Sequence, residues 1–412
     1  MRCHNNMDIR RIKSKITSKL SIYVAIRKMQ IYMQGYRYRK RNKGKITKRK
    51  RIVFLTVYPQ GWNSLKTVYE SMKQIGGIEV MILAWTGYPY PGNTGEYWKS
   101  IDYNAIISSN EKIIDLRKLK PDIVIRQTPY NDEYPKCYSA KNISKVSRLC
   151  YIPYSYEPSP LKHLEIEYNN HFLPYLSAVF CDNSCTMEYC QNTIAGSRYT
   201  ADIKCYDYGF PRFDISDIEK YRDRYKVYLW LPRWSLDSEK NDGSSFFLFF
   251  DKLMDYFSEH ENIRLIIRPH PSMFNNFVKN KALTEEEVIQ IKRKIADVSN
   301  VTLDETADYI VSFNESDILI SDFSSLVVEY FLTGKPILYC GNMDEYNYIV
   351  YRMIELSYKV DSWNDLRNKI EALTCGEDVT VKERMEFVRQ FRMDEHGKNS
   401  TSRIVEAIIN DI

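Results

Sequence analysis

Short apolar runs recur along the chain from residue 52 onward, separated by segments with helical spacing such as residues 64–74. Each run consists of consecutive apolar residues without polar alternation, which is typical of parallel strands buried on both faces. This alternation predicts doubly wound α/β domains. The predicted strands of a first series are residues 52–57, 79–85, 122–126, 149–153 and 178–181, and those of a second series are 227–231, 264–267, 301–303, 318–320 and 336–339.

The two strand series predict two Rossmann-like domains. A chain of 412 residues suits two domains of ordinary size. We assign residues 52–215 to the first domain and 226–385 to the second, with a charged run over 217–226 as the connection between them. Residues 386–412 are expected to form a C-terminal helix that packs back toward the first domain.

A strongly basic extension precedes the first domain. Residues 1–51 contain 18 Lys and Arg against one acid, Asp8, whereas the remaining 361 residues contain 41 basic and 52 acidic side chains. The formal charge of +6 therefore originates in the extension. Apolar residues at helical spacing predict a basic amphipathic helix over residues 7–33, with Ile9, Ile12, Ile16, Leu20, Tyr23 or Val24 and Ile31 on one side.

Such a helix suits the surface of an anionic membrane. Two alternatives remain open, a solvated disordered arm and a nucleic-acid contact, although no fold motif for reading bases accompanies the charge. No apolar run reaches the length needed to span a bilayer. The nine cysteines show no zinc-type spacing, so no metal site is expected, and without a signal peptide the cytoplasm is the expected compartment.

Two polar segments follow predicted strands of the second domain. Arg268-Pro-His-Pro271 supplies a fixed cation and an imidazole, His270, on a backbone restricted by prolines. Ser321-Asp-Phe-Ser-Ser325 is expected to begin a helix near Ser324, with Ser321 or Asp322 as its cap. Hydroxyls and unpaired N–H groups at a helix start can bind an anion. Because carboxyl ends of parallel strands share one edge of a sheet, the two segments are expected to converge on a diphosphate.

At these residues the chain resembles the CDP-glycerol glycerophosphotransferase family, the polymerases and primases of teichoic acid and related capsule polymers. The motifs that carry the resemblance are Arg268-Pro-His-Pro271, Ser321-Asp-Phe-Ser-Ser325 and Gly334-Lys-Pro-Ile-Leu338, with weaker matches at Tyr228-Leu-Trp-Leu-Pro-Arg-Trp234, Gly209-Phe-Pro-Arg-Phe-Asp214 and Asp394-Glu-His-Gly-Lys398. The resemblance implies a GT-B-like fold, in which an acceptor domain and a nucleotide-donor domain face a central cleft.

The resemblance also implies the reaction. Glycerol phosphate, or a similar polyol phosphate, would move from CDP-glycerol to a hydroxyl of a cell-surface polymer or lipid-linked glycan, with release of CMP. His270 would act on the diphosphate, and the donor would also contact Arg268, Ser321, Ser324, Ser325, Glu329, Arg233 and Arg212. Glu329 is expected on the ribose. No cofactor is expected, because fixed cations can neutralise the leaving phosphate and the cytidine nucleotide is itself a substrate.

The acceptor side departs from the family pattern. Relatives resemble His-Gly-Thr-Pro-Leu-Lys where this chain has Glu157-Pro-Ser-Pro-Leu-Lys162, which puts Glu157 in the position of the histidine. A carboxylate can serve as general base. We therefore assign this role to Glu157, with His163 as the alternative base.

Two other functions fit the same motifs. Bacterial sialyltransferases resemble the chain in carrying a His-Pro and a Ser-Ser element, so a GT-B glycosyltransferase using a CMP- or UDP-sugar is one alternative. The other is a non-catalytic, membrane-docked scaffold that has lost its acceptor base. Each version places the protein at the inner face of the cell membrane as a peripheral protein.

Overall fold

The structure is a computed structural model. It describes residues 3–43, 50–158, 161–214, 225–236, 243–306, 309–341, 346–394 and 396–412, without the side chains of residues 3–20 and 161–163. The chain forms two compact units. Unit 1 comprises Met1–Glu157, Leu161–Arg212 and Ser400–Ile412, and unit 2 comprises Pro158–Pro160 and Phe213–Asn399.

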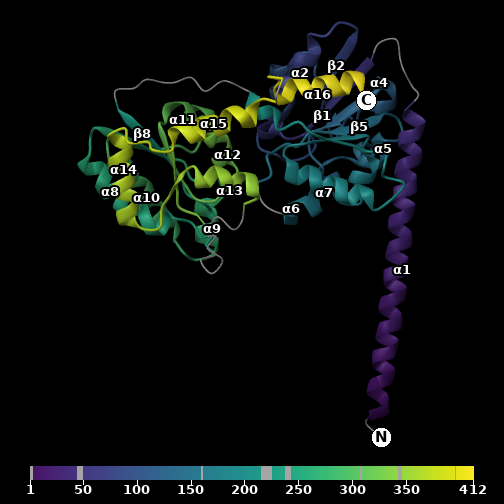
Figure 1. Ribbon diagram of the computed structural model, residues 1–412, viewed down its shortest axis with the longest axis horizontal. Helices are drawn as coiled ribbons and strands as arrows, with labels where there is room; N and C mark the ends of the chain where they lie inside the picture. The colour runs from purple at the N-terminus through teal and green to yellow at the C-terminus, as the bar shows by residue number, and fades with distance from the viewer. Residues whose placement is uncertain are drawn as a thin grey trace. The chain divides into compact units, whose positions relative to one another are not determined.

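Unit 1 is built on a seven-stranded, fully parallel sheet in the order β3-β2-β1-β4-β5-β6-β7 (Figure 1). Its strands are β1 (Lys50–Thr56), β2 (Ile78–Trp85), β3 (Ile106–Ser108), β4 (Ile123–Arg126), β5 (Arg148–Tyr151), β6 (Ala178–Cys181) and β7 (Lys204–Asp207). Its α-helices are α1 (Cys3–Asn42), α2 (Asn63–Lys73), α3 (Gly95–Ile101), α4 (Leu116–Leu119), α5 (Ala140–Ile143), α6 (Leu161–Glu167), α7 (Ser184–Ala195) and α16 (Ser400–Asn410).

Alternate side chains of the central strand β1 enter two separate hydrophobic cores. Val53 and Leu55 pack in a cluster with residues of α5 and the segments around α6 and α7, whereas Ile52 and Phe54 pack with α2 and α16. Successive side chains of a strand point to opposite faces. Both faces of this sheet are therefore covered, which explains the continuous apolar runs in its central strands.

Unit 2 has a six-stranded parallel sheet in the order β10-β9-β8-β11-β12-β13. Its strands are β8 (Lys226–Leu231), β9 (Ile263–Ile267), β10 (Val301–Leu303), β11 (Ile318–Ser321), β12 (Ile337–Tyr339) and β13 (Tyr358–Lys359). Its α-helices are α8 (Phe246–Glu259), α9 (Met273–Lys279), α10 (Glu285–Ala296), α11 (Ile310–Glu315), α12 (Leu326–Phe331), α13 (Tyr348–Glu355), α14 (Trp363–Thr374) and α15 (Val381–Arg392).

The expected boundary at residue 51 implies that helix α1 lies outside unit 1. In the structure α1 belongs to unit 1. Tyr32, Arg39 and Asn42 are buried, and the Arg39 guanidinium donates to the Asp202 carboxylate at 2.6 Å and to the Tyr199 carbonyl oxygen. At Gly35 a Cβ atom would lie 2.0 Å from the carbonyl oxygen of Pro174. The C-terminal part of α1 therefore docks closely on unit 1, whereas every side chain from residue 21 to 30 is exposed.

The predicted apolar face of this helix is described only in part, because the side chains of Ile9, Ile12, Ile16 and Leu20 lie outside the described residues. Within the described part of the chain, none of the helices combines the length and apolar composition that a bilayer crossing requires.

The C-terminal segment also differs from its predicted form. Residues 386–412 do not form one helix that packs on the first domain, because α15 belongs to unit 2 and only α16 belongs to unit 1. In unit 1 the Thr67 and Thr401 hydroxyls lie 2.7 Å apart, and Lys50 donates to the Ile408 and Ile409 carbonyl oxygens near the end of α16. Most of the charged run 217–226, which is the predicted connection, lies outside the described residues, because the structure does not describe residues 215–224.

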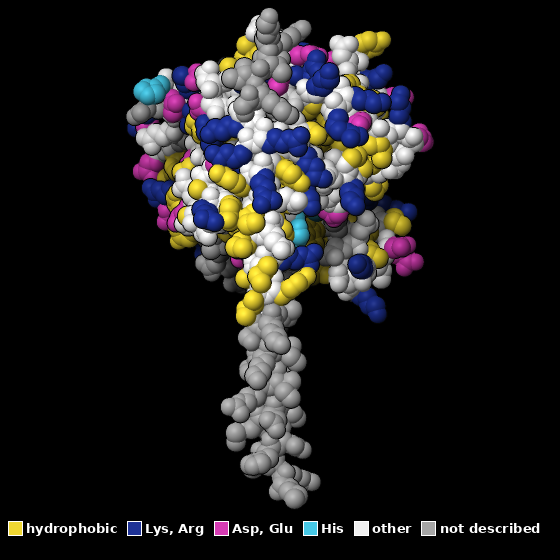
Figure 2. All heavy atoms as spheres, turned by 90° about the vertical axis from the view of Figure 1, so that its right-hand side faces the viewer, with side chains coloured by type: hydrophobic (Ala, Val, Ile, Leu, Met, Phe, Trp, Pro, Cys, Tyr) yellow, Lys and Arg dark blue, Asp and Glu magenta, His cyan; other side chains and the backbone are white. Residues whose placement is uncertain are grey.

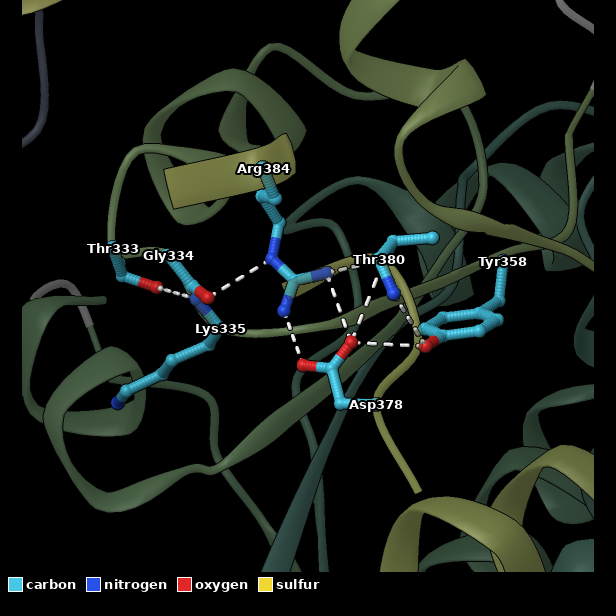
Figure 3. Close-up of polar contacts among 7 residues, drawn as sticks. All are labelled: Thr333, Gly334, Lys335, Tyr358, Asp378, Thr380 and Arg384. Carbon is cyan, nitrogen blue, oxygen red and sulfur yellow. Dashed lines mark hydrogen bonds and ion pairs between the residues drawn. The ribbon is translucent and has the colours of Figure 1, made fainter. Parts of the chain in front are cut away.

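In unit 2, α15 is held by the buried Arg384 (Figure 3). Its guanidinium donates to the Gly334 carbonyl oxygen at 2.9 Å, to the Thr380 hydroxyl at 2.7 Å and to the Asp378 carboxylate. Gly334 has φ +76°, a conformation that favours glycine after a helix. Lys335 donates to the Phe313 carbonyl oxygen at 2.7 Å and to that of Ser316 at the end of α11. The Gly-Lys-Pro motif is thus part of the framework of unit 2.

We expect Arg384→Ala to lower the free energy of unfolding by about 3–5 kcal/mol, because Asp378 loses its buried cation. Chemical denaturation of the full chain measures this loss. Arg389 lies on the same helix but pairs with Glu386 at an exposed position, so Arg389→Ala should cost less than about 1 kcal/mol. Equal effects of the two substitutions would contradict the assigned role of Arg384.

Candidate functional site

The strand order of unit 2 changes direction between β8 and β11. Open parallel sheets bind their ligands outside the carboxyl ends of the strands at such a point. Since β9 and β11 both pair with β8, the ends of β9 and β11 lie about 10 Å apart. The loops that carry Arg233, His270 and Ser324 therefore meet at one edge of this sheet, as the sequence predicts.

His270 follows β9 and is exposed. Its backbone N–H donates to the Pro232 carbonyl oxygen at 3.3 Å, and its Nδ1 accepts the N–H of Ser272 at 3.1 Å. Partial loss of hydration and the nearby Arg233 charge lower the pKa of His270. The neutral ring is favoured, with its proton on Nε2. In the free protein His270 thus presents a hydrogen-bond donor at Nε2.

Arg268 connects the loop after β9 to the loop after β10. Its guanidinium forms an ion pair with Asp304 and donates to the Thr306 carbonyl oxygen at 2.7 Å. The side chains of Arg268 and Asp304 are 11% and 12% exposed. Arg268 therefore joins the ends of β9 and β10, and its charge is largely neutralised by Asp304.

Asp322 organises the edge between β8 and β11. One carboxylate oxygen accepts the N–H of Arg233 at 2.8 Å and that of Ser245 at 3.0 Å. Burial raises the pKa of Asp322, and the hydrogen bonds from Ser245 and Arg233 oppose this rise. The Arg233 guanidinium lies 4.6 Å from the centre of the Phe323 ring, which keeps this cation at the same edge.

The Ser-Asp-Phe-Ser-Ser segment differs from its predicted form. Helix α12 starts at Leu326 and neither Ser321 nor Asp322 caps it, since the buried Ser321 hydroxyl donates to the carbonyl oxygen of Asp322. The Ser324 hydroxyl accepts the N–H of Leu326 at 3.2 Å, and Ser325 is exposed. The helix begins near Ser324 as predicted, but the predicted cap is wrong, because the Asp322 carboxylate binds the N–H groups of Arg233 and Ser245 instead.

Glu329 lies in the first turn of α12 and is half-buried. Its carboxylate accepts the hydroxyl of Tyr309 at 2.7 Å. This hydrogen bond orients Glu329 from the segment that precedes α11.

Glu157 belongs to unit 1, where it follows β5 and is half-buried. Its N–H donates to the Asp182 carboxylate at 2.7 Å, and its carbonyl oxygen accepts from the Asn183 amide at 3.3 Å. Burial raises the pKa of Asp182 to about 7, and the charge of Glu157 contributes to this rise. Burial likewise raises the pKa of Glu167 to about 8, although its hydrogen bond from Tyr151 opposes the shift.

Tyrosines surround the carboxyl edge of the unit 1 sheet. They come from the segments after β1, β2, β4 and β5, with ring centres 4.6 Å apart for Tyr58 and Tyr90 and 5.8 Å apart for Tyr58 and Tyr154. The Tyr130 and Tyr154 hydroxyls lie 3.2 Å apart. Aromatic faces with polar tips suit a polyhydroxylated substrate.

The last two predicted site residues are Arg212 and His163. Arg212 is buried in a short 3-10 helix, Pro211–Asp214, at the end of unit 1. The side chain of His163 lies outside the described residues. Sequence reasoning missed Asp182 and Glu167, and it took Asp322 only as a helix cap. Each aspartate directly follows a buried strand, which is the signal that would have identified both as residues of the carboxyl edge.

Comparison with known proteins identifies the family. The sequence profile of the CDP-Glycerol:Poly(glycerophosphate) glycerophosphotransferase family matches residues 181–410. The chain belongs to this family. The matched region includes His270, Ser324, Ser325 and Glu329.

A curated relative is the minor teichoic acid biosynthesis protein GgaB of Bacillus subtilis (strain 168), which is 25% identical over 230 residues. The match covers 49% of this chain and 23% of the relative, so the chain spans less than a quarter of the length of GgaB.

Two solved structures have a similar fold. The wall teichoic acid polymerase TagF is 15% identical, with a TM-score of 0.52 over 94% of this chain and 97% of TagF. UDP-GlcNAc 2-epimerase from Neisseria meningitidis is 13% identical, with a TM-score of 0.56 over 87% of this chain and 99% of the epimerase. The α/β, GT-B-like class with two Rossmann-like sheets is confirmed.

The raised pKa of Asp182 makes stability depend on pH. Between about pH 4 and 7 the folded protein keeps a proton on Asp182 that the unfolded chain releases, so the free energy of unfolding falls as pH rises. Asp182→Asn should flatten this decrease by on the order of 1–3 kcal/mol, while an amide oxygen still accepts the Glu157 N–H. Chemical denaturation at pH 5 and at pH 8 measures the change in the free energy of unfolding between the two pH values. An equal change for parent and variant would refute the raised pKa of Asp182.

Proposed function

We propose that this chain transfers glycerol phosphate, or a similar polyol phosphate, from CDP-glycerol to a hydroxyl of a cell-surface polymer or lipid-linked glycan, and releases CMP. The observation that supports this most directly is the family match over residues 181–410, which contains the residues of the β8–β9–β11 edge. The proposed reaction requires no cofactor.

In this proposal the acceptor oxygen attacks the phosphorus distal to cytidine. A new P–O bond forms to the acceptor, the P–O bond of the diphosphate breaks, and CMP leaves with the bonding electron pair. His270 donates from Nε2 to a phosphate oxygen, where charge grows as the bond breaks. Arg233 adds positive charge at the same edge, Ser324 and Ser325 contact the diphosphate, and Glu329 contacts the ribose.

The acceptor proton passes to the carboxylate of Glu157 in this proposal. The hydrogen bond from the Glu157 N–H to Asp182 supports this role, because it holds the backbone of the loop in one place. The tyrosines at the carboxyl edge of unit 1 suit the acceptor chain, since they combine ring faces with hydroxyl groups.

The reaction is tested by measuring CMP release from CDP-glycerol with a polymer or lipid-linked acceptor. We expect His270→Ala to lower kcat/KM by about 10²–10³-fold, and Glu157→Gln by about 10²–10⁴-fold. His260→Ala and Glu188→Gln are matched controls away from the two edges and should retain turnover.

Each other outcome identifies an alternative. Turnover only with a CMP- or UDP-sugar would favour a glycosyltransferase, and nucleotide binding without turnover would favour a scaffold. Unchanged turnover of Glu157→Gln would show that Glu157 is not the base.

We further propose that the basic extension docks on the inner face of an anionic cell membrane. Exposed apolar side chains of α1 support this, together with basic residues on the same helix and the face beside it (Figure 2). Ile22, Val24 and Ile26 are 59%, 58% and 48% exposed. Apolar and basic side chains together bind anionic interfaces.

Replacing Ile22, Val24 and Ile26 together by serine should weaken binding to vesicles with anionic lipid by at least about tenfold, because the variant buries less apolar surface. Co-sedimentation measures this, and thermal unfolding should stay unchanged since the three side chains are exposed. Deleting residues 1–51 is a poorer test, because it removes the buried Arg39. Equal vesicle binding by parent and triple variant would contradict docking through α1.

A further inference from the structure

A cavity of about 420 Å³ lies open at the surface of unit 1, between α1, α6 and α7. Lys28 lines it from α1, Glu165 and Asn170 from α6 and the segment that follows, and Tyr189 and Asn192 from α7. Its volume falls within the range of about 300–1,000 Å³ found for small-molecule sites. None of the residues assigned above to phosphate transfer lines this cavity.

The cavity has a fixed wall because α1 is docked beside it. The Tyr32 hydroxyl donates to the Asn170 side-chain oxygen at 2.9 Å, and the Lys28 ammonium lies 5.5 Å from the centre of the Tyr32 ring. Arg39, further along α1, is anchored by Asp202. These contacts hold Lys28 next to the ends of α6 and α7.

The lining offers polar groups that the described part of the protein does not use. Asn169 is fully engaged, since its amide donates to the Ile166 carbonyl oxygen and its oxygen accepts the His171 N–H. By contrast, the Asn192 amide and the Glu165 carboxylate form no hydrogen bond with any of the described residues. An amide offers donors and an acceptor, and a carboxylate offers acceptors.

The charges of the lining do not favour binding of a phosphate or a divalent cation. Lys28 and Glu165 contribute one positive and one negative charge, so the cavity lacks the excess of cations that would hold a phosphate. A divalent cation prefers several oxygen ligands including carboxylates, and Glu165 is the single acid in this lining. A neutral ligand with many hydroxyl groups matches this set of donors and acceptors.

Aromatic rings complete the site. Tyr168 and Tyr189 both line the cavity, with ring centres 6.4 Å apart and planes at 49°. Tyr168 is 2% exposed and its ring packs against Tyr151, so its position is set by the core. Tyr189 is half-buried and is the ring that a ligand can contact. A ring beside hydrogen-bonding groups suits a sugar, whose C–H face is apolar and whose edge carries hydroxyls.

We propose that this cavity binds a neutral saccharide, and that the saccharide is part of the acceptor. The second statement rests on the proposed transferase function, whereas binding itself does not. The exposed residues Ile22 to Ile26 lie within two turns of Lys28 along α1. A glycan presented at a membrane surface would therefore meet the cavity close to the docking segment.

Saturation-transfer NMR with the full chain tests the inference. The probes are neutral hexoses, N-acetylhexosamines and their disaccharides, with glycerol 3-phosphate as a charged comparison. We expect saturation of at least one neutral saccharide and weaker signals for glycerol 3-phosphate. Asn192→Ala and Glu165→Gln should each weaken binding by about tenfold, as expected for lost hydrogen bonds.

Gln191→Ala is the matched control, because Gln191 is the exposed neighbour of Asn192 on α7 and does not line the cavity. It should bind like the parent. Absence of saccharide signals, stronger binding of glycerol 3-phosphate, or equal binding by Asn192→Ala and the parent would each overturn the inference. Saccharide binding without CMP release would overturn the transferase proposal and leave the binding site standing.

Discussion

The carboxylate of Asp322 is the constraint on which the carboxyl edge of the unit 2 sheet depends. It is buried, and one of its oxygens accepts backbone N–H groups from the loop after β8 and from the residue before α8. Two segments that are distant from Asp322 in sequence are thereby fixed at the end of β11. A buried carboxylate is costly unless such donors compensate it. The Arg233 loop is consequently ordered before any ligand binds.

Unit 1 uses the same arrangement at its own sheet. Asp182 directly follows β6, is buried, and accepts the N–H of Glu157 from the neighbouring strand's loop. In both units an aspartate at a strand end orders the loop of an adjacent strand. The two aspartates differ in surroundings, because Asp182 lies near the carboxylates of Glu157 and Glu167, whereas Asp322 lies near the guanidinium of Arg233. The unit 1 edge therefore favours a protonated carboxyl group, whereas the unit 2 edge carries a positive charge.

The sequence predicts the central strands well and the edges poorly. Strand β6 has its predicted bounds, since its residues are buried on both faces and form one apolar run. The strands that the pattern misses are β3, β7 and β13, which all lie at sheet edges, whereas the fourth edge strand, β10, has its predicted bounds. Edge strands pack on fewer sides and need no continuous apolar run. Their existence depends on a neighbour that is distant in sequence.

The candidate site shows the same division. The position of His270 after β9 follows from the motif. The partial burial and the Arg233 charge that lower the pKa of His270, and the hydrogen bond that its Nδ1 accepts from Ser272, are properties of the folded loops. Arg268 is read from the sequence as a ligand for phosphate, whereas Asp304 and Thr306 already bind its guanidinium. A partner that sits on another strand cannot be identified from local spacing.

The continuity of helix α1 has a mechanical consequence. From Ile22 to the anchored Arg39 the backbone is a single helix, which corresponds to about 25 Å at 1.5 Å per residue. A flexible linker would let Ile22 move freely relative to the sheet of unit 1. A continuous helix that is anchored at Arg39 instead holds Ile22 at a set distance from that sheet.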